Sequence, residues 1–154
     1  MGSWMDTEAR SSPPPFSTTP ASGTAPTGTD PKITVLVVDD EPAMIEIVCI
    51  MLLALGYRAF GVPDGREALR RASISGGARI DILLTDYWMP VMRGDELALR
   101  FRKACPAAGI ILMSGNFPEL LSVPDCEFLA KPFHGAALRE KVHAALANGK
   151  KRHP

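Results

Sequence analysis

Six side chains that can bind a cation or a phosphoryl group stand at the ends of four apolar runs. They are, in chain order, Asp39, Asp40, Glu41, Asp86, Ser114 and Lys131. Carboxylates brought together repel one another, and a bound hard cation such as Mg²⁺, which prefers oxygen ligands, removes that conflict. One carboxylate can then attack a phosphoryl group, while a hydroxyl and an ammonium group hold the phosphoryl oxygens. These residue types fit magnesium-dependent phosphoryl transfer if the fold brings them together.

The elements that must position these residues follow from the hydrophobic pattern. Continuous β-branched and apolar runs are typical of buried strands, and helical patterns separate them. The expected strands are 33–38, 57–62, 80–85, 109–113 and 127–130, and the expected helices are 42–55, 64–73, 95–104, a short 118–122, and 134–147. This alternation predicts an α/β fold, a parallel sheet with helices on both faces. Because the functional crevice lies beyond the carboxyl ends of such strands, the six side chains should meet there.

The chain of 154 residues divides by composition into a tail, one domain and a short basic end. Pro, Ser, Thr and Gly fill 20 of the first 31 positions, so residues 1–31 are expected to be disordered. The folded domain is expected to span residues 32–148. Residues 149–154 are expected to form a short basic tail that aids solubility.

Composition also excludes several classes of partner. Lys plus Arg and Asp plus Glu each number 17, and this balance argues against a nucleic-acid-binding protein. No apolar run approaches the roughly 20 residues of a membrane span, so no membrane association is expected. Three cysteines give neither metal-site pairing nor an even disulfide count, which is typical of a reduced, cytoplasmic protein.

Four motifs resemble the receiver domain of two-component response regulators. They are VVDDEP at 37–42, LLTDYWMPVMRG at 83–94, LMSG at 112–115 and FLAKPF at 128–133. The resemblance covers about residues 32–148. It implies a flavodoxin-like, doubly wound sheet of five parallel strands in the order 2-1-3-4-5 with five helices, the fourth one short.

The resemblance also implies roles for the acidic residues. Asp86 is similar to the phosphoacceptor of the family. Asp40 and Asp86 resemble the direct carboxylate ligands of Mg²⁺, and the backbone carbonyl of Trp88 resembles a third ligand. Asp39 is similar to the acidic residue that holds a metal-bound water. On this resemblance, Mg²⁺ is the cofactor that the chain requires.

A second group of residues resembles the parts of the family that respond to phosphorylation. Ser114 is similar to the switch hydroxyl, and Lys131 is similar to the cation that pairs with a phosphoryl oxygen. Phe128 stands at the position of the family's aromatic switch residue. Lys131-Pro132 matches a peptide that is usually cis in the family, so Pro132 is expected to be structural.

The implied function is a phosphoacceptor receiver in a phosphorelay. A histidine kinase or a histidine phosphotransfer protein would supply the phosphoryl group to Asp86, and the change would alter partner binding. The chain would assist only its own phosphorylation and dephosphorylation, and so would not be an enzyme in the ordinary sense. The alternatives are a receiver segment of a larger hybrid histidine kinase and an interaction module that works without phosphorylation. A phosphohydrolase is disfavoured because it needs a carboxylate at position 88.

The sequence departs from the family in the length between Ser114 and Lys131. These residues are only 17 positions apart, which leaves room for a short fourth helix and puts the family's usual output geometry in doubt. Nothing resembling an output domain follows Pro132.

The first helix is unusually apolar. From Ala43 to Leu55, 12 of 13 residues are apolar and only Glu46 is charged. A helix on the surface of a domain normally keeps a polar face. Either both sides of this helix are buried within the domain, or one side is a partner surface. In the resembled family this helix helps to dock the histidine phosphodonor, so we expect a partner surface, of which a homodimer would be one form.

Overall fold

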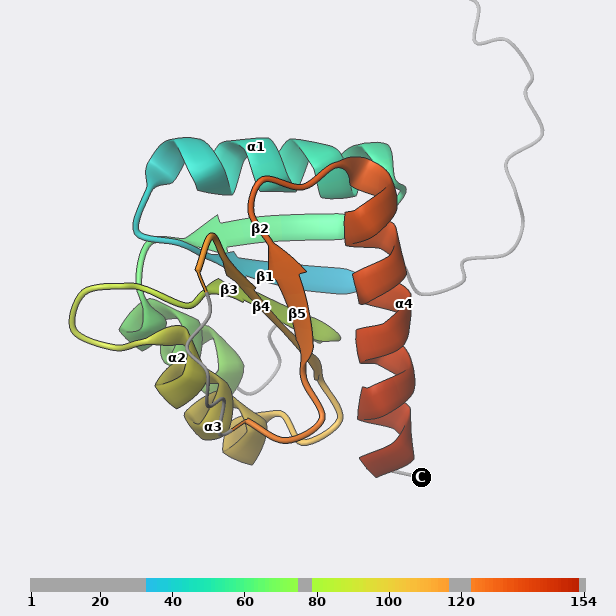
Figure 1. The fold of residues 1–154 in the computed structure, drawn as a ribbon. Helices are drawn as coiled ribbons and strands as arrows, with labels where there is room; N and C mark the ends of the chain where they lie inside the picture. The colour runs from blue at the N-terminus through green and yellow to red at the C-terminus, as the bar shows by residue number, and fades with distance from the viewer. Residues whose placement is uncertain (1–32, 75–78, 117–122, 153–154) are drawn as a thin grey trace, which may run out of the picture.

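Five strands form the centre of the computed structural model, which describes residues 33–74, 79–116 and 123–152. They make one parallel sheet in the order β2-β1-β3-β4-β5 (Figure 1). The strands are β1 (Thr34–Val38), β2 (Arg58–Val62), β3 (Ile82–Asp86), β4 (Gly109–Ser114) and β5 (Glu127–Ala130). Every residue of β1, β3 and β4 is buried, which explains their continuous apolar runs. The predicted fold and strand order are confirmed.

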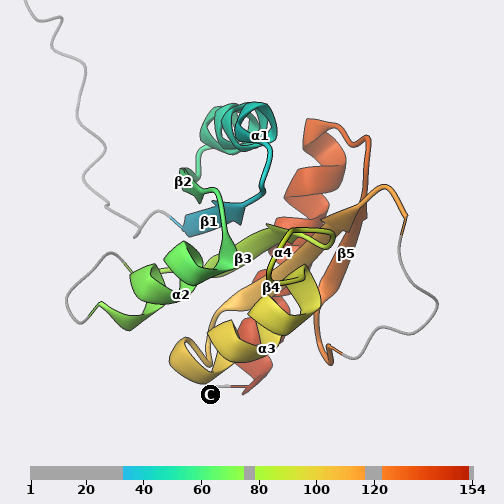
Figure 2. The ribbon, with the colours of Figure 1, turned by 90° about the vertical axis from the view of Figure 1, so that its left-hand side faces the viewer.

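Four helices of the described chain cover the two faces of this sheet. They are α1 (Pro42–Ala54), α2 (Gly65–Ser73), α3 (Gly94–Ala104) and α4 (Gly135–Arg152). α1 and α4 pack on one face, and α2 and α3 pack on the other (Figure 2). Alternate residues of each strand supply two separate cores, so that Val35 and Val37 face α1 and α4, whereas Leu36 and Val38 face α2 and α3.

The ends of the helices follow largely from local sequence. Pro42 opens α1, and Gly56, with φ of 90°, ends it. Asp64 and Glu67 have the spacing of a helix capping box, and the Asp64 carboxylate accepts a hydrogen bond from the Glu67 amide at 2.8 Å. The short helix expected at 118–122 lies outside the described residues. None of the helices in the described part of the chain is long and apolar enough to cross a membrane.

The last helix differs from its prediction. It continues to Arg152 rather than ending near residue 147, so residues 149–152 are helical. Gly149 lies within the helix and is buried. A Cβ at Gly149 would lie 2.3 Å from the Ala107 carbonyl oxygen, so glycine is required here for close packing.

The order of the strands sets the place of the candidate site. β1 and β3 are neighbours, and the chain leaves β1 towards one face and β3 towards the other. Their carboxyl ends therefore open between diverging loops, which is where parallel α/β sheets bind ligands.

Candidate functional site

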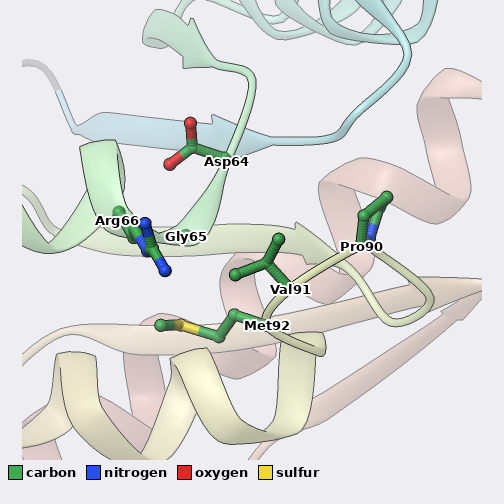
Figure 3. A pocket seen from close by; sticks show the side chains of 6 residues that line it. All are labelled: Asp64, Gly65, Arg66, Pro90, Val91 and Met92. Carbon is green, nitrogen blue, oxygen red and sulfur yellow. The ribbon is translucent and has the colours of Figure 1, made fainter.

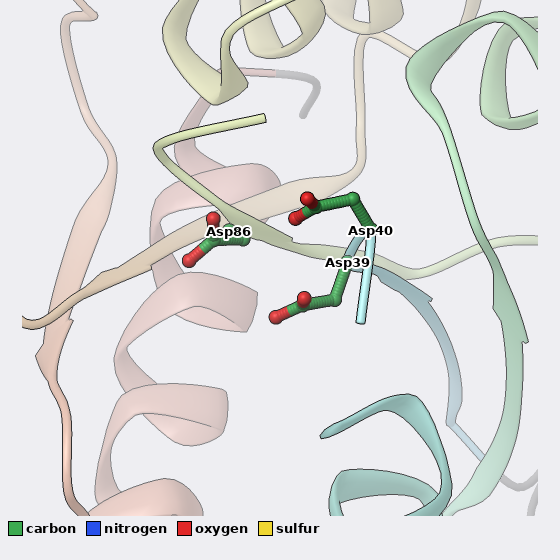
Figure 4. Close-up of side chains that lie close together, drawn as sticks. All are labelled: Asp39, Asp40 and Asp86. Atoms are coloured by element: carbon green, nitrogen blue, oxygen red, sulfur yellow. The ribbon is translucent and has the colours of Figure 1, made fainter. Parts of the chain in front are cut away.

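Three carboxylates meet at the carboxyl ends of β1 and β3. Asp39 and Asp40 follow the last residue of β1, and Asp86 is the last residue of β3. One oxygen from each of these side chains lies within 4.8 Å of the other two (Figure 4). Asp39 and Asp86 are buried, whereas Asp40 is exposed to solvent. The cluster is therefore open on the side of Asp40.

Lys131 brings a cation into this cluster from the far side of the sheet. It follows β5 directly, and its backbone N–H donates to the Ser114 carbonyl at 2.9 Å. Its Nζ lies 3.0 Å from Asp39 Oδ2 and 2.8 Å from Asp86 Oδ1. The Lys131–Pro132 peptide bond is cis. A single ammonium group thus bridges the two buried carboxylates, although 92 residues separate Lys131 from Asp39.

The electrostatics of Asp86 combine burial with charges of both signs. Burial, together with the nearby Asp39 and Asp40 carboxylates, raises the pKa of Asp86, although the hydrogen bond from Lys131 opposes this rise. For Lys131, burial alone would lower the pKa, but the hydrogen bonds to Asp86 and Asp39 outweigh burial and raise it. Lys131 therefore keeps its positive charge, and Asp86 is a more basic carboxylate than an exposed aspartate.

Ser114 and Phe128 lie on the two strands beyond β3. Ser114 ends β4 and is buried, with its Oγ donating to the Asn116 carbonyl at 2.8 Å and accepting from the Asn116 amide at 3.1 Å. Phe128 pairs with Leu112 in the sheet and packs, half-buried, against the core under α2 and α3. The Ser114 hydroxyl is thus held by the loop that follows it.

Trp88 also reaches the Asn116 carbonyl, a contact that sequence reasoning missed. Its indole Nε1 donates to that oxygen at 2.9 Å, its side chain is 52% exposed, and its ring meets Tyr87 edge-on at 4.8 Å. The loop after β3 and the loop after β4 are thereby tied together. No residue pattern signals this contact, because the acceptor is a backbone carbonyl.

The loop that carries Trp88 is held in place by polar contacts at the start of α3. Tyr87 Oη donates to Asp95 Oδ2 at 3.1 Å, and Arg93 Nη2 lies 3.1 Å from the same carboxylate oxygen. The Gly94 amide donates to the Tyr87 carbonyl at 2.9 Å. A Cβ at Gly94 would lie 2.2 Å from the Asp86 carbonyl oxygen, so the loop folds back tightly beneath Asp86.

Glu41 supports the site through its backbone. Its amide donates to Asp39 Oδ1 at 2.9 Å, and its side chain is exposed. Asp39 therefore has both of its oxygens engaged, one by this amide and one by Lys131.

The donor set suits one kind of chemistry. Three carboxylates with one open side fit a small, hard cation that keeps some of its water, as Mg²⁺ does. An ammonium group next to the buried carboxylates can stabilise the oxygens of an incoming phosphoryl group.

Comparisons with known proteins point the same way. The family model described as the response regulator receiver domain matches residues 35–143. The putative two-component response regulator ARR21 of Arabidopsis thaliana is 33% identical over 120 residues, which are 76% of this chain and 19% of that protein. The sensor histidine kinase TmoS of Ectopseudomonas mendocina is 35% identical over 117 residues, which are 70% of this chain and 11% of that kinase. This chain thus spans a small part of both relatives.

Solved structures share the fold over nearly their whole length. The Vibrio cholerae chemotaxis protein CheY4 has a TM-score of 0.67 and 28% identity, with 75% of this chain and 99% of that chain covered. The receiver domain of the sensor histidine kinase PA1611 from Pseudomonas aeruginosa, which has a magnesium ion coordinated in its active-site cleft, has a TM-score of 0.66 and 28% identity, with 75% and 98% covered. The fold, the motifs and the family model agree: this chain belongs to the response regulator receiver domains of two-component signalling.

Proposed function

We propose that this chain accepts a phosphoryl group on Asp86 from a phosphohistidine, with Mg²⁺ bound, and that the modified surface then changes its affinity for partners. The observation that carries the proposal is the cluster of Asp39, Asp40 and Asp86, with oxygens within 4.8 Å of one another and with Lys131 bridging two of them. A phosphorylation-independent interaction module would have no use for such an arrangement of charges, which costs stability through repulsion.

The transfer exchanges one bond to phosphorus for another. An Asp86 carboxylate oxygen attacks the phosphorus atom, and a P–O bond forms while the P–N bond to the imidazole breaks. The imidazole nitrogen leaves with the electron pair of the P–N bond and takes a proton from solvent. Burial favours this reaction at Asp86, because water is kept from the developing acyl phosphate.

Lys131 and Ser114 are proposed to act on the phosphorylated state. The Lys131 ammonium group already lies 2.8 Å from Asp86 Oδ1, so it is poised to pair with a phosphoryl oxygen on that carboxylate. Ser114 is proposed to leave the Asn116 carbonyl and donate its hydroxyl to another phosphoryl oxygen. Phe128 would repack as the loop after Ser114 moves. These changes give the two-state element that converts modification into altered binding.

Mg²⁺ is the proposed cofactor. Asp40 and Asp86 would hold it directly with the Trp88 backbone carbonyl, and Asp39 would hold it through a water. The exposed Asp40 carboxylate supports this assignment, because it leaves one side of the cluster open to a hydrated cation. When bound, the ion neutralises the carboxylates and the phosphoryl oxygens, so that like charges do not oppose the transfer.

The proposed phosphodonor is a histidine kinase or a histidine phosphotransfer protein in the cytoplasm. α1 is the proposed docking surface, because Ile47, Ile50 and Leu53 are 53%, 59% and 55% exposed. A homodimer through the same face is the competing occupant. A receiver segment of a larger hybrid kinase is a second arrangement, favoured by the match to the sensor histidine kinase TmoS. The chain is proposed to assist only its own phosphorylation and dephosphorylation.

The central test is the intact mass of the protein after incubation with Mg²⁺ and acetyl phosphate. The wild-type chain should gain one phosphoryl group, and an excess of EDTA should prevent the gain. Asp86→Asn and Asp40→Asn should both fail to gain it while keeping the wild-type circular dichroism spectrum. Asp64→Asn is the matched control, because asparagine caps a helix as well as aspartate does and the residue lies outside the cluster. Modification of Asp86→Asn to the wild-type level would overturn the proposal.

A further inference from the structure

The loop that follows β4 is loosely packed where the structure describes it. Gly115 and Asn116 are exposed, and a Cβ at Gly115 would lie more than 4 Å from every described atom outside its chain neighbours. Within the described part of the chain, the Asn116 carbonyl accepts hydrogen bonds from the Ser114 hydroxyl at 2.8 Å and from the Trp88 indole at 2.9 Å. The Asn116 amide donates to the same Ser114 hydroxyl at 3.1 Å. The position of this loop therefore depends on two side chains, those of Ser114 and Trp88.

The loop that carries Trp88 is, in contrast, packed against the rest of the domain. The Trp88 ring meets the buried Tyr87 edge-on at 4.8 Å, and the Tyr87 hydroxyl donates to the buried Asp95 carboxylate. Farther along the same loop, Met92 is buried, and with Pro90 it lines a small hollow beside the start of α2 (Figure 3). The hydrogen bond from Trp88 therefore connects the loosely packed loop after β4 to a well packed one.

The two donors that share the Asn116 carbonyl behave differently under the proposed function. A carbonyl oxygen has two lone pairs, so it can accept from both donors at once. Ser114 is proposed to turn its hydroxyl to a phosphoryl oxygen on Asp86, and it then gives up its hydrogen bond to the Asn116 carbonyl. The Trp88 indole donates to that carbonyl from a different loop, so it can keep this hydrogen bond when Ser114 moves.

We propose that Trp88 is a positioning residue for this switch, and that its indole N–H holds the Asn116 carbonyl while the Ser114 hydroxyl moves. The loop then pivots about Asn116 instead of leaving the site, so that Ser114 stays within reach of Asp86. The Trp88 side chain acts through Ser114 and takes no part in the transfer of the phosphoryl group. In the phosphorylated state this role rests on the proposed function, whereas the hold on Asn116 exists without any modification.

An exposed tryptophan does not by itself require such a role, because single apolar side chains are common on protein surfaces. Two observations favour a role for the indole nitrogen of Trp88. Its distance of 2.9 Å to the Asn116 carbonyl is that of a normal hydrogen bond, although 28 residues separate the two. The oxygen that it meets is also the one to which Ser114 donates. A side chain that only covered Tyr87 would serve equally well as phenylalanine, and this difference can be tested.

The first test needs no phosphorylation, because Ser114→Ala removes the hydroxyl that is proposed to leave. ¹⁵N relaxation of the full chain gives the order parameters of the Gly115 and Asn116 amides. Ser114→Ala alone should keep both at about 0.85, the value of a rigid backbone, whereas Ser114→Ala combined with Trp88→Phe should lower both below about 0.6. The Met113 amide, inside β4, should stay rigid in both variants.

Trp88→Phe is a narrow change, because it keeps an aromatic ring at this position and removes the indole N–H. The Trp88 side chain is 52% exposed, so this variant should fold. Trp4→Phe is the matched control, since it makes the same substitution at the other tryptophan of the chain, and it should leave the order parameters of Ser114→Ala unchanged. Equal order parameters in Ser114→Ala with and without Trp88→Phe would overturn the proposal. So would an equal loss of order in the Trp4→Phe control.

The second test follows the chain in acetyl phosphate and Mg²⁺. The change in the NMR shift of the Phe128 amide on phosphorylation is measured in the wild type and in Trp88→Phe, and intact mass gives the modified fraction, so that both are compared at equal modification. In Trp88→Phe this change should fall to about half of the wild-type value or less, because the switched state is less populated when Ser114 has no fixed position. Equal changes would overturn the positioning role and leave the phosphorylation of Asp86 standing. If neither protein gained phosphoryl mass, the proposed function would fail, and the order parameters in the Ser114→Ala background would still decide whether Trp88 holds the loop.

Discussion

α1 and α2 lie on opposite faces of the same sheet, and they expose side chains of opposite character to solvent. α1 buries Val48 and Leu52 against the sheet, yet it also leaves large apolar side chains on its outer side. α2 buries Gly65 and Ala68, and its outer side carries arginines held by Glu67. Charged side chains that pair with one another thus lie on the outer side of α2, whereas large apolar side chains are exposed on the outer side of α1. Two helices that pack on the same sheet can therefore expose very different side chains to solvent.

The largest effects should come from emptying either core. Leu52 on α1 and Leu97 on α3 are both fully buried, on opposite faces. Truncating a buried leucine loses transfer free energy and leaves a cavity, so Leu52→Ala and Leu97→Ala should each lower the free energy of unfolding by about 2–5 kcal/mol. Urea denaturation followed by circular dichroism measures both. A cost near zero for Leu52→Ala alone would mean that α1 is not packed on the sheet as firmly as α3.

Smaller but unequal effects are expected at two glycines, one on each face. A Cβ at Gly94 would meet the Asp86 backbone carbonyl, which cannot move without displacing β3. A Cβ at Gly61 would meet the Cγ2 methyl of Ile45 instead, and this branched side chain can give way only by leaving its preferred χ1 rotamer. We expect Gly94→Ala to cost about 3 kcal/mol and Gly61→Ala about 1 kcal/mol. Thermal unfolding compares the two variants, and equal losses would contradict this distinction between backbone and side-chain obstacles.

The sequence was sufficient for the sheet because strands buried on both faces have a distinctive composition. β1 and β3 are continuous apolar runs that end at carboxylates, and that pattern alone predicted where Asp39, Asp40 and Asp86 would stand. Lys131 was predicted in the same way, from its place after β5.

What the sequence did not reveal depends on contacts between distant segments. The indole of Trp88 reaches a backbone carbonyl at Asn116, and the identity of a residue says nothing about its carbonyl. The last helix was predicted to end near residue 147, yet α4 continues through Gly149, which permits the helix to approach Ala107. The hollow that Arg66, Arg70 and Arg100 line was also missed, since it exists only once α2 and α3 lie side by side.

The caps of α1 and α2 also differ, and removing a cap should change the free energy of unfolding by about 1 kcal/mol. Asp64 accepts a hydrogen bond from the Glu67 amide, whereas the side chain of Glu41, at the start of α1, makes no capping hydrogen bond. Asp64→Ala should therefore destabilise the domain by about 1 kcal/mol, and Glu41→Ala should change its stability very little. Chemical denaturation with a common slope measures both values. A loss at Glu41→Ala as large as at Asp64→Ala would show that charge at the helix start, rather than the hydrogen bond, is what stabilises it.

The smallest effect on stability, and the sharpest on binding, is expected on the outer side of α1. Ile50 is 59% exposed and Leu99 of α3 is 41% exposed, so a lysine at either position should change the free energy of unfolding by no more than about 0.5 kcal/mol. If the outer side of α1 binds a partner, Ile50→Lys places a charge in that interface and should slow phosphotransfer from a histidine phosphodonor, while Leu99→Lys should not. Light scattering on the same two variants distinguishes a phosphodonor from a second copy of the chain, because only a homodimer would dissociate without the donor present. If Ile50→Lys leaves both phosphotransfer and molecular mass unchanged, the outer side of α1 is an apolar surface without a partner, and the contrast with α2 is one of composition alone.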